Sequence, residues 1–192
     1  PNIIYSDVTL NWHENIILCF SLSKVGLPGV RTGIIVAAPE VVKAVSSLNA
    51  IVNLSPTRFG AAIVTPLLQD GRLKQLSDDV IRPFYRNQAQ TAVSLLKREL
   101  GAYPLKIHKP EGAIFLWLWF ENLPVSSQTL YEMLKAEGTL IIPGEHFFVG
   151  IDTQDYPHAR ECIRMSIAQD AETLEKGIAA IGRVVRGLYD AA

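Results

Sequence analysis

One stretch of the chain gathers residues that could bind and activate a small molecule. Residues 21–33 read SLSKVGLPGVRTG, and Lys24 and Arg31 are the only cations among them. Two short apolar runs, residues 16–20 and 34–37, flank the stretch and predict buried strands. Lys and Arg are seldom buried without a partner. A loop that brings two of them close to buried structure therefore indicates a bound ligand.

Lys24 is the candidate for covalent chemistry. Burial disfavours the ammonium form of a lysine, and the free amine can form a Schiff base with a carbonyl. Arg31, the hydroxyls of Ser21 and Ser23 and the amides exposed by nearby glycines could hold a phosphate. A cofactor with an aldehyde and a phosphate, pyridoxal phosphate, needs both. The alternative is an ordinary Gly- and Pro-rich link with solvated charges. The order of a P-loop, with glycines before the lysine, is absent.

The motif of residues 21–33 resembles the lysine box of the fold-type I aminotransferases, the aspartate aminotransferase superfamily. The resemblance implies that Lys24 forms the Schiff base with pyridoxal phosphate. It also implies that Ser21 and Arg31 contact the cofactor phosphate. Ser23, next to the lysine, is a further candidate for cofactor binding.

The resemblance covers nearly the whole chain and implies an α/β fold, the C-terminal part of the PLP-dependent transferase fold. Residues 1–77 would form the end of the large cofactor-binding domain, and residues 78–192 the small C-terminal domain. In the family, a long N-terminal half supplies the partner of the pyridine nitrogen and the aromatic that stacks on the ring. No match to those motifs precedes Lys24. The chain is therefore expected to be the C-terminal portion of a longer enzyme and to be inactive alone.

Arg164 is the candidate for substrate binding. It is the only charge in the apolar run 162–167, CIRMSI. A guanidinium offers two parallel donors to a carboxylate, which fixes the orientation of a planar anion. Since the family carries an arginine at this strand to bind the substrate α-carboxylate, the resemblance implies that role here. The alternative is an arginine that reaches solvent from an edge strand.

The reaction implied is PLP-dependent transamination between a neutral aliphatic amino acid and a 2-oxo acid. Segments 11–24 and 53–60 resemble a bacterial subgroup of the family that acts on valine, alanine and pyruvate. Relatives that bind dicarboxylic substrates have an arginine in the segment that matches residues 48–52, LNAIV, which contain none. Two alternatives stay open: a carbon–sulfur lyase of the same fold, and a non-catalytic regulatory domain that binds a ligand.

The composition argues against several other kinds of partner. The net charge of −1 does not suggest nucleic acid or an anionic membrane. No apolar run is long enough to span a bilayer. The four histidines and two cysteines show no metal-ligand spacing. We expect a cytoplasmic enzyme that binds small molecules, holds no metal and, as in the family, forms a homodimer.

The apolar pattern along the chain predicts alternating helices and strands. Helices are expected from Pro39, over 59–68, over 72–100 with a kink or break at Pro83, over 127–136, and after the capping residue Asp170. Helical spacing predicts one apolar face on the first of these helices and one apolar stripe on the last: Val41, Val42, Val45 and Leu48; Leu174, Ile178, Ile181, Val185 and Leu188. Strands are expected over 114–120, 139–142 and 162–168. The aromatics Phe115 and Trp117, and those of the turn 143–148, are interpreted as packing residues.

Overall fold

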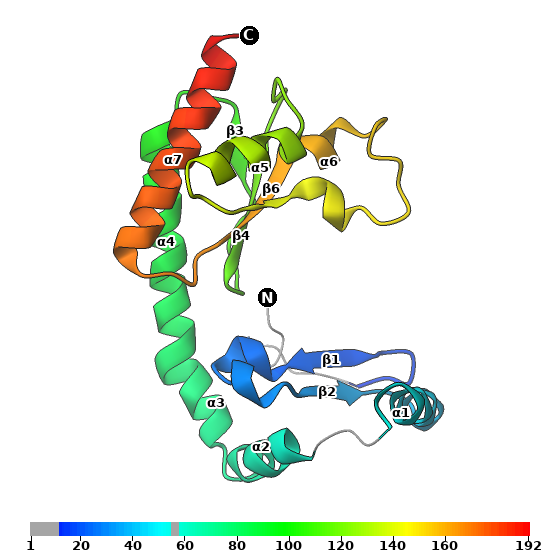
Figure 1. The fold of residues 1–192 in the computed structure, drawn as a ribbon. Helices are drawn as coiled ribbons and strands as arrows, with labels where there is room; N and C mark the ends of the chain where they lie inside the picture. The colour runs from blue at the N-terminus through cyan, green and yellow to red at the C-terminus, as the bar shows by residue number, and fades with distance from the viewer. Residues whose placement is uncertain (1–11, 55–57) are drawn as a thin grey trace. The chain divides into compact units, whose positions relative to one another are not determined.

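The computed structural model describes residues 12–54 and 58–192. The chain divides into two compact units, Pro1–Phe84 and Tyr85–Ala192 (Figure 1). The division falls inside a helix, because α4 runs over Arg82–Leu100. The domain boundary expected after residue 77 stays a prediction.

The first unit begins, in its described part, with an antiparallel hairpin. Strand β1 (Leu18–Ser21) pairs with β2 (Gly33–Val36), so that Ser21 lies opposite Gly33. Two short 3-10 helices, η1 (Leu22–Val25) and η2 (Pro28–Val30), form the connection between the strands. Three helices follow the hairpin: α1 (Pro39–Asn53), α2 (Phe59–Gln69) and α3 (Arg72–Leu76).

The core of the first unit is small. It consists of four buried side chains, those of Leu22, Val25, Val64 and Leu73. The prediction of buried flanking strands is wrong for this chain, since Ile17 is 56% exposed and β2 has no buried residue. The apolar face predicted for α1 is exposed as well. The reason is architectural, because a two-stranded hairpin buries its faces only where another layer packs on it. The described residues half-bury one face of the hairpin, at Leu18, Phe20 and Ile34, and leave the other face exposed.

The chain stays helical through Pro83, so of the predicted kink or break the break is not observed. One wide turn, η3 (Ser77–Ile81), joins α3 to α4, and the Arg82 N–H donates to the Ser77 carbonyl five residues earlier. A proline has no N–H, and its ring collides with the carbonyl four residues before it. A wider turn at this point accommodates both defects without ending the helix.

The second unit contains a four-stranded antiparallel sheet with the order β3-β4-β6-β5. Its strands are β3 (Leu105–Ile107), β4 (Phe115–Phe120), β5 (Ile142–Pro143) and β6 (Cys162–Ser166). Strand β3 was not predicted, because three residues carry too little pattern. The strand expected over 139–142 is reduced to the two residues of β5. Helices α5 (Ser127–Ala136), α6 (Pro157–Glu161) and α7 (Ala171–Asp190) and the 3-10 helix η4 (Gly144–Phe147) complete the unit.

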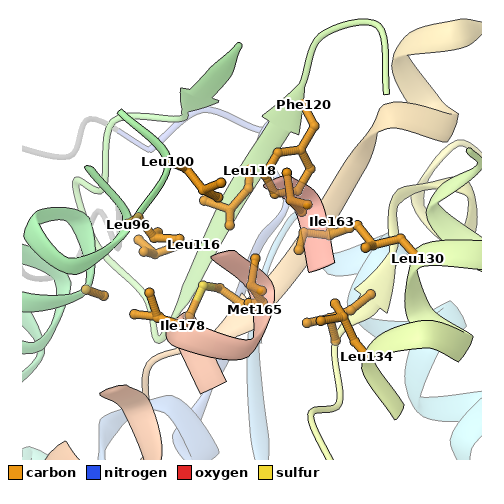
Figure 2. Close-up of a cluster of buried hydrophobic side chains, with 14 of the residues drawn as sticks. Leu96, Leu100, Leu116, Leu118, Phe120, Leu130, Leu134, Ile163, Met165 and Ile178 are labelled. Atoms are coloured by element: carbon orange, nitrogen blue, oxygen red, sulfur yellow. The ribbon is translucent and has the colours of Figure 1, made fainter. Parts of the chain in front are cut away.

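The core of the second unit lies on one face of this sheet. Leu116, Leu118 and Phe120 of β4 are buried, whereas the alternate residues on the opposite face are only half-buried. Figure 2 shows the buried side chains of β4 among those of α4, α5, β6 and α7. Successive side chains of a strand point to opposite faces of the sheet. The apolar run of β4 therefore has a core face and a second face formed by Phe115, Trp117 and Trp119.

The last helix matches its prediction closely. The Asp170 carboxylate accepts a hydrogen bond of 2.9 Å from the Thr173 N–H and so caps α7. The apolar stripe predicted for this helix packs into the core through Leu174, Ile178, Ile181 and Val185.

Candidate active site

Lys24, the predicted Schiff-base lysine, lies at an exposed position in the connection between β1 and β2. In the 3-10 helix η1, Leu22 and Val25 are three residues apart and both point into the small core. A 3-10 helix has three residues per turn, so the two residues between them, Ser23 and Lys24, face away. Lys24 is exposed. The dry environment expected for it is therefore not supplied by the described part of the chain.

Arg31 lies close to Ser23 across the same connection. Its Nη1 donates to Ser23 Oγ at 3.4 Å. Arg31 also has a positive φ of 46°, which is uncommon for a residue with a Cβ and often marks a functional constraint. No carboxylate among residues 12–54 and 58–192 forms an ion pair with this guanidinium.

Gly60 holds the end of the connection against helix α2, a feature that sequence reasoning missed. A Cβ on Gly60 would overlap Thr32 Oγ1 and would lie 2.6 Å from the Val30 carbonyl oxygen. The Thr32 hydroxyl in turn donates to that carbonyl at 2.7 Å. The only available signal was a glycine in the first turn of a helix, where its cost to the helix suggests a packing reason.

The groups of this connection suit an aldehyde phosphate such as pyridoxal phosphate. Residues 21–33 contain no Asp or Glu. They hold the exposed Lys24, two serine hydroxyls, and Arg31, which has no acidic partner among the described residues. Ser21 ends β1 at an exposed position opposite Gly33. The structure brings Ser23 and Arg31 into contact, while Ser21 and Lys24 stand on the same short connection. This donor set fits the anionic end and the carbonyl end of the cofactor.

Arg164 occupies an interior strand of the second unit. Strand β6 lies between β4 and β5, so the interpretation of Arg164 as an edge-strand charge does not hold. Its neighbours in the register are Trp117 and Ile142. The side chain is half-buried, and its Cζ lies over the rings of Phe115 at 4.1 Å and Phe147 at 4.8 Å. Sequence reasoning gave both phenylalanines a packing role and missed their contact with the guanidinium.

Three further findings concern a buried thiol, metal-ligating side chains and the helices of the described residues. Burial raises the pKa of the Cys162 thiol to about 12, so this cysteine is a poor nucleophile at neutral pH. The described residues contain no group of three or more His, Cys, Asp and Glu side chains that could hold a metal ion. Among the described helices, none has the length and apolar character needed to cross a membrane.

The chain is similar to aminotransferases in both sequence and structure. Residues 5–181 match the model of the family "aminotransferase class I and II". The valine–pyruvate aminotransferase of Escherichia coli is 43% identical over 178 residues, which are 93% of this chain and 42% of that protein. The chain thus spans less than half of the length of this relative.

Two solved structures share the fold over almost the entire chain. A putative amino-acid aminotransferase from Psychrobacter arcticum has 67% sequence identity and a TM-score of 0.91, over 98% of this chain and 43% of that one. The valine–pyruvate aminotransferase of Salmonella typhimurium has 39% identity and a TM-score of 0.89, over 98% of this chain and 48% of that one. The predicted α/β aminotransferase fold is therefore confirmed, and the chain belongs to the class I and II aminotransferase family.

Proposed function

We propose that the chain forms part of a PLP-dependent transaminase that transfers the amino group between valine or alanine and a 2-oxo acid, pyruvate or 2-oxoisovalerate. The observation that carries the proposal is the exposed connection of residues 21–33, where Lys24 stands beside the contacting pair Ser23 and Arg31. The family is PLP-dependent. The 43% identity to a valine–pyruvate aminotransferase supports the choice of substrates.

The residues of the connection divide between two tasks in this proposal. Arg31, Ser21 and Ser23 hold the cofactor phosphate through a guanidinium and two hydroxyls. Lys24 would hold the cofactor aldehyde through its Nζ, and its amine, once released, would accept the proton that leaves the substrate Cα. The bound cofactor supplies an electron-withdrawing ring that stabilises negative charge at that carbon.

Arg164 binds the α-carboxylate in the same proposal. Its position on an interior strand and the absence of an acidic partner among the described residues leave its N–H donors available to an anion. The apolar end of α1, which carries the exposed residues Leu48, Ile51 and Val52 and no arginine, is consistent with a substrate whose side chain is uncharged.

The test combines a spectrum with a chemical trap on the whole protein. With pyridoxal phosphate we expect a visible absorption band, and after borohydride reduction and peptide mapping a cofactor adduct on Lys24. An adduct spread over surface lysines, with none at Lys24, would contradict the assignment. Arg31→Ala should weaken cofactor binding, whereas Arg72→Ala, an exposed arginine paired with Asp70, serves as the matched control.

A second assay separates the proposal from its alternatives. Incubation with valine and pyruvate should form alanine and 2-oxoisovalerate in equal amounts. Failure to form alanine from valine and pyruvate, with release of a thiol, ammonia and a 2-oxo acid from a sulfur-containing amino acid such as cystathionine, would indicate a carbon–sulfur lyase. Binding without turnover would indicate a regulatory domain. A homodimer and a cytoplasmic location are further parts of the proposal, supported by the family resemblance.

A further inference from the structure

We propose that Phe115 and Phe147 are positioning residues that hold the Arg164 guanidinium in place for a carboxylate ligand, an inference that rests on the carboxylate-binding role proposed for Arg164. The two rings come from different segments, β4 and η4, and both lie under the same guanidinium.

The contacts of Arg164 explain why rings suit this task. A guanidinium meets an aromatic ring through its flat face, and its five N–H donors point outward in its plane. Ring contacts therefore restrain the group without using the donors. Since no carboxylate of the described residues forms an ion pair with Arg164, these donors are available to a planar anion.

The ring of Phe147 is itself held in position. Trp117, directly opposite Arg164 in the β4–β6 register, meets Phe147 edge-on with ring centroids 5.3 Å apart. Phe147 is 42% exposed and is not among the buried core residues of this unit, and it contacts Trp117 and Arg164. The arrangement places one cation and three rings on the sheet face opposite the core of this unit.

The neighbouring Phe148 offers a matched control. It is the same residue type one position later, it contacts Trp117, Tyr156 and His158, and no contact with Arg164 is observed among the described residues. Loss of the Phe148 ring should therefore remove its contacts with these three rings and leave the contacts of the Arg164 guanidinium in place.

The experiment measures carboxylate binding and turnover separately in the whole protein. Binding of isovalerate, a carboxylate that cannot donate an amino group, is followed by tryptophan fluorescence, and valine–pyruvate transamination is measured alongside. We expect Phe115→Leu and Phe147→Leu each to raise the isovalerate Kd and the valine KM by about 2- to 5-fold, as the loss of one cation–π contact predicts. The value of kcat should stay within about 2-fold, because the reacting atoms are not touched.

Three further single variants and one double variant make the result decisive. Phe115→Tyr and Phe147→Tyr keep a ring face and should restore both constants, and Phe148→Leu should leave them unchanged. In an Arg164→Ala background, Phe147→Leu should add nothing, because coupled residues are not additive.

The outcomes separate this inference from the proposed function. If the wild type transaminates but the two leucine variants bind isovalerate as well as it does, or if Phe148→Leu weakens binding equally, the positioning role is wrong. If the wild type binds isovalerate with the expected variant effects and does not transaminate, the positioning role stands and the proposed function fails. Isovalerate binding that is unaffected by Arg164→Ala would overturn both roles of this site.

Discussion

The two compact units of the chain bury their apolar residues to very different extents. In residues 85–192, one face of the sheet packs against three helices, and Leu118, Leu130 and Ile163 are fully buried. In residues 12–54 and 58–84, four side chains form the core, and Ile17 before β1 and apolar residues of β2 and α1 are exposed. The second unit therefore has its own stabilising core, whereas the first presents apolar faces that its described part does not cover.

This difference in core size applies to the candidate site residues as well, because they lie in both units. The residues proposed to hold the cofactor stand on a connection anchored by the small core of the first unit. The arginine proposed to bind the carboxylate stands on an interior strand backed by the large core of the second. A large core holds a side chain through many neighbours, and a small one through a few close contacts such as the approach of Gly60 to Thr32. Four predictions test this comparison.

The largest effect is expected at Lys24, the proposed catalytic lysine of the first unit. Lys24→Ala in the whole protein should lower kcat for valine–pyruvate transamination by at least about 10³-fold, since both the attachment point and the proton carrier are lost. Steady-state kinetics measure the loss. Lys43→Ala, at an exposed position on α1, is the control and should be neutral. Retention of full activity by Lys24→Ala would show that the lysine has no catalytic role.

A substitution in the core of the second unit should destabilise the protein more than one on the exposed face of the first. Leu118→Ala leaves a cavity in the second unit and should lower the free energy of unfolding by about 2–5 kcal/mol. Val42→Ala on the exposed face of α1 should cost less than about 0.5 kcal/mol in this chain. Urea unfolding followed by tryptophan fluorescence measures both, and Trp117 and Trp119 report on the second unit. Equal losses would contradict the contrast between the two cores.

A smaller loss of stability is expected in the first unit, where Gly60 lies close to Thr32 and Val30. Gly60→Ala should cost about 1–3 kcal/mol, because its Cβ overlaps the Thr32 hydroxyl and crowds the Val30 carbonyl. Gly29→Ala is the control, because Gly29 lies in the connection that Gly60 contacts and has open space around its Cβ. Unfolding followed by far-UV circular dichroism gives the comparison. A stabilised Gly60→Ala would mean that helix propensity outweighs the close contact.

The smallest effect concerns pH and the cap of α7. Hydrogen bonds from the Thr173 hydroxyl and N–H lower the pKa of Asp170 below its ordinary value of 3.8. A depressed carboxyl pKa adds stability that is present above the unfolded pKa and is lost as pH falls through the folded pKa. Asp170→Asn keeps an acceptor but does not titrate, so it should flatten the decline in the thermal midpoint below about pH 4.

A second cap provides the reference for that measurement. Ser126 accepts from the Thr129 N–H at 3.2 Å and caps α5 without a titratable group. Ser126→Ala should lower stability by about 1 kcal/mol to the same extent at every pH. An acid decline that Asp170→Asn leaves unchanged would show that this carboxylate is not responsible for it.

Local sequence signals were sufficient to predict many helices and strands and to select the candidate site residues. The cap at Asp170 and the apolar stripe of α7 follow from residue type and helical spacing, and both are observed. The residues of the lysine box indicated the family that the comparisons confirm. Their assigned roles, and those of Arg164, stay predictions. The wide turn before Pro83 was not predictable, because a proline signals a defect in the helix but not how the backbone accommodates it.

The sequence by itself determined which groups are available: a lysine, an arginine and serines in one glycine-rich connection, and a lone arginine in an apolar strand. Only the tertiary structure decided their surroundings. Strand order made β6 an interior strand, and packing of distant segments brought Phe115 and Phe147 to the Arg164 guanidinium. The physical reason is that residue type and periodicity are local properties. Exposure, close approach and ring contacts instead depend on which layers, far apart in the sequence, come to lie against one another.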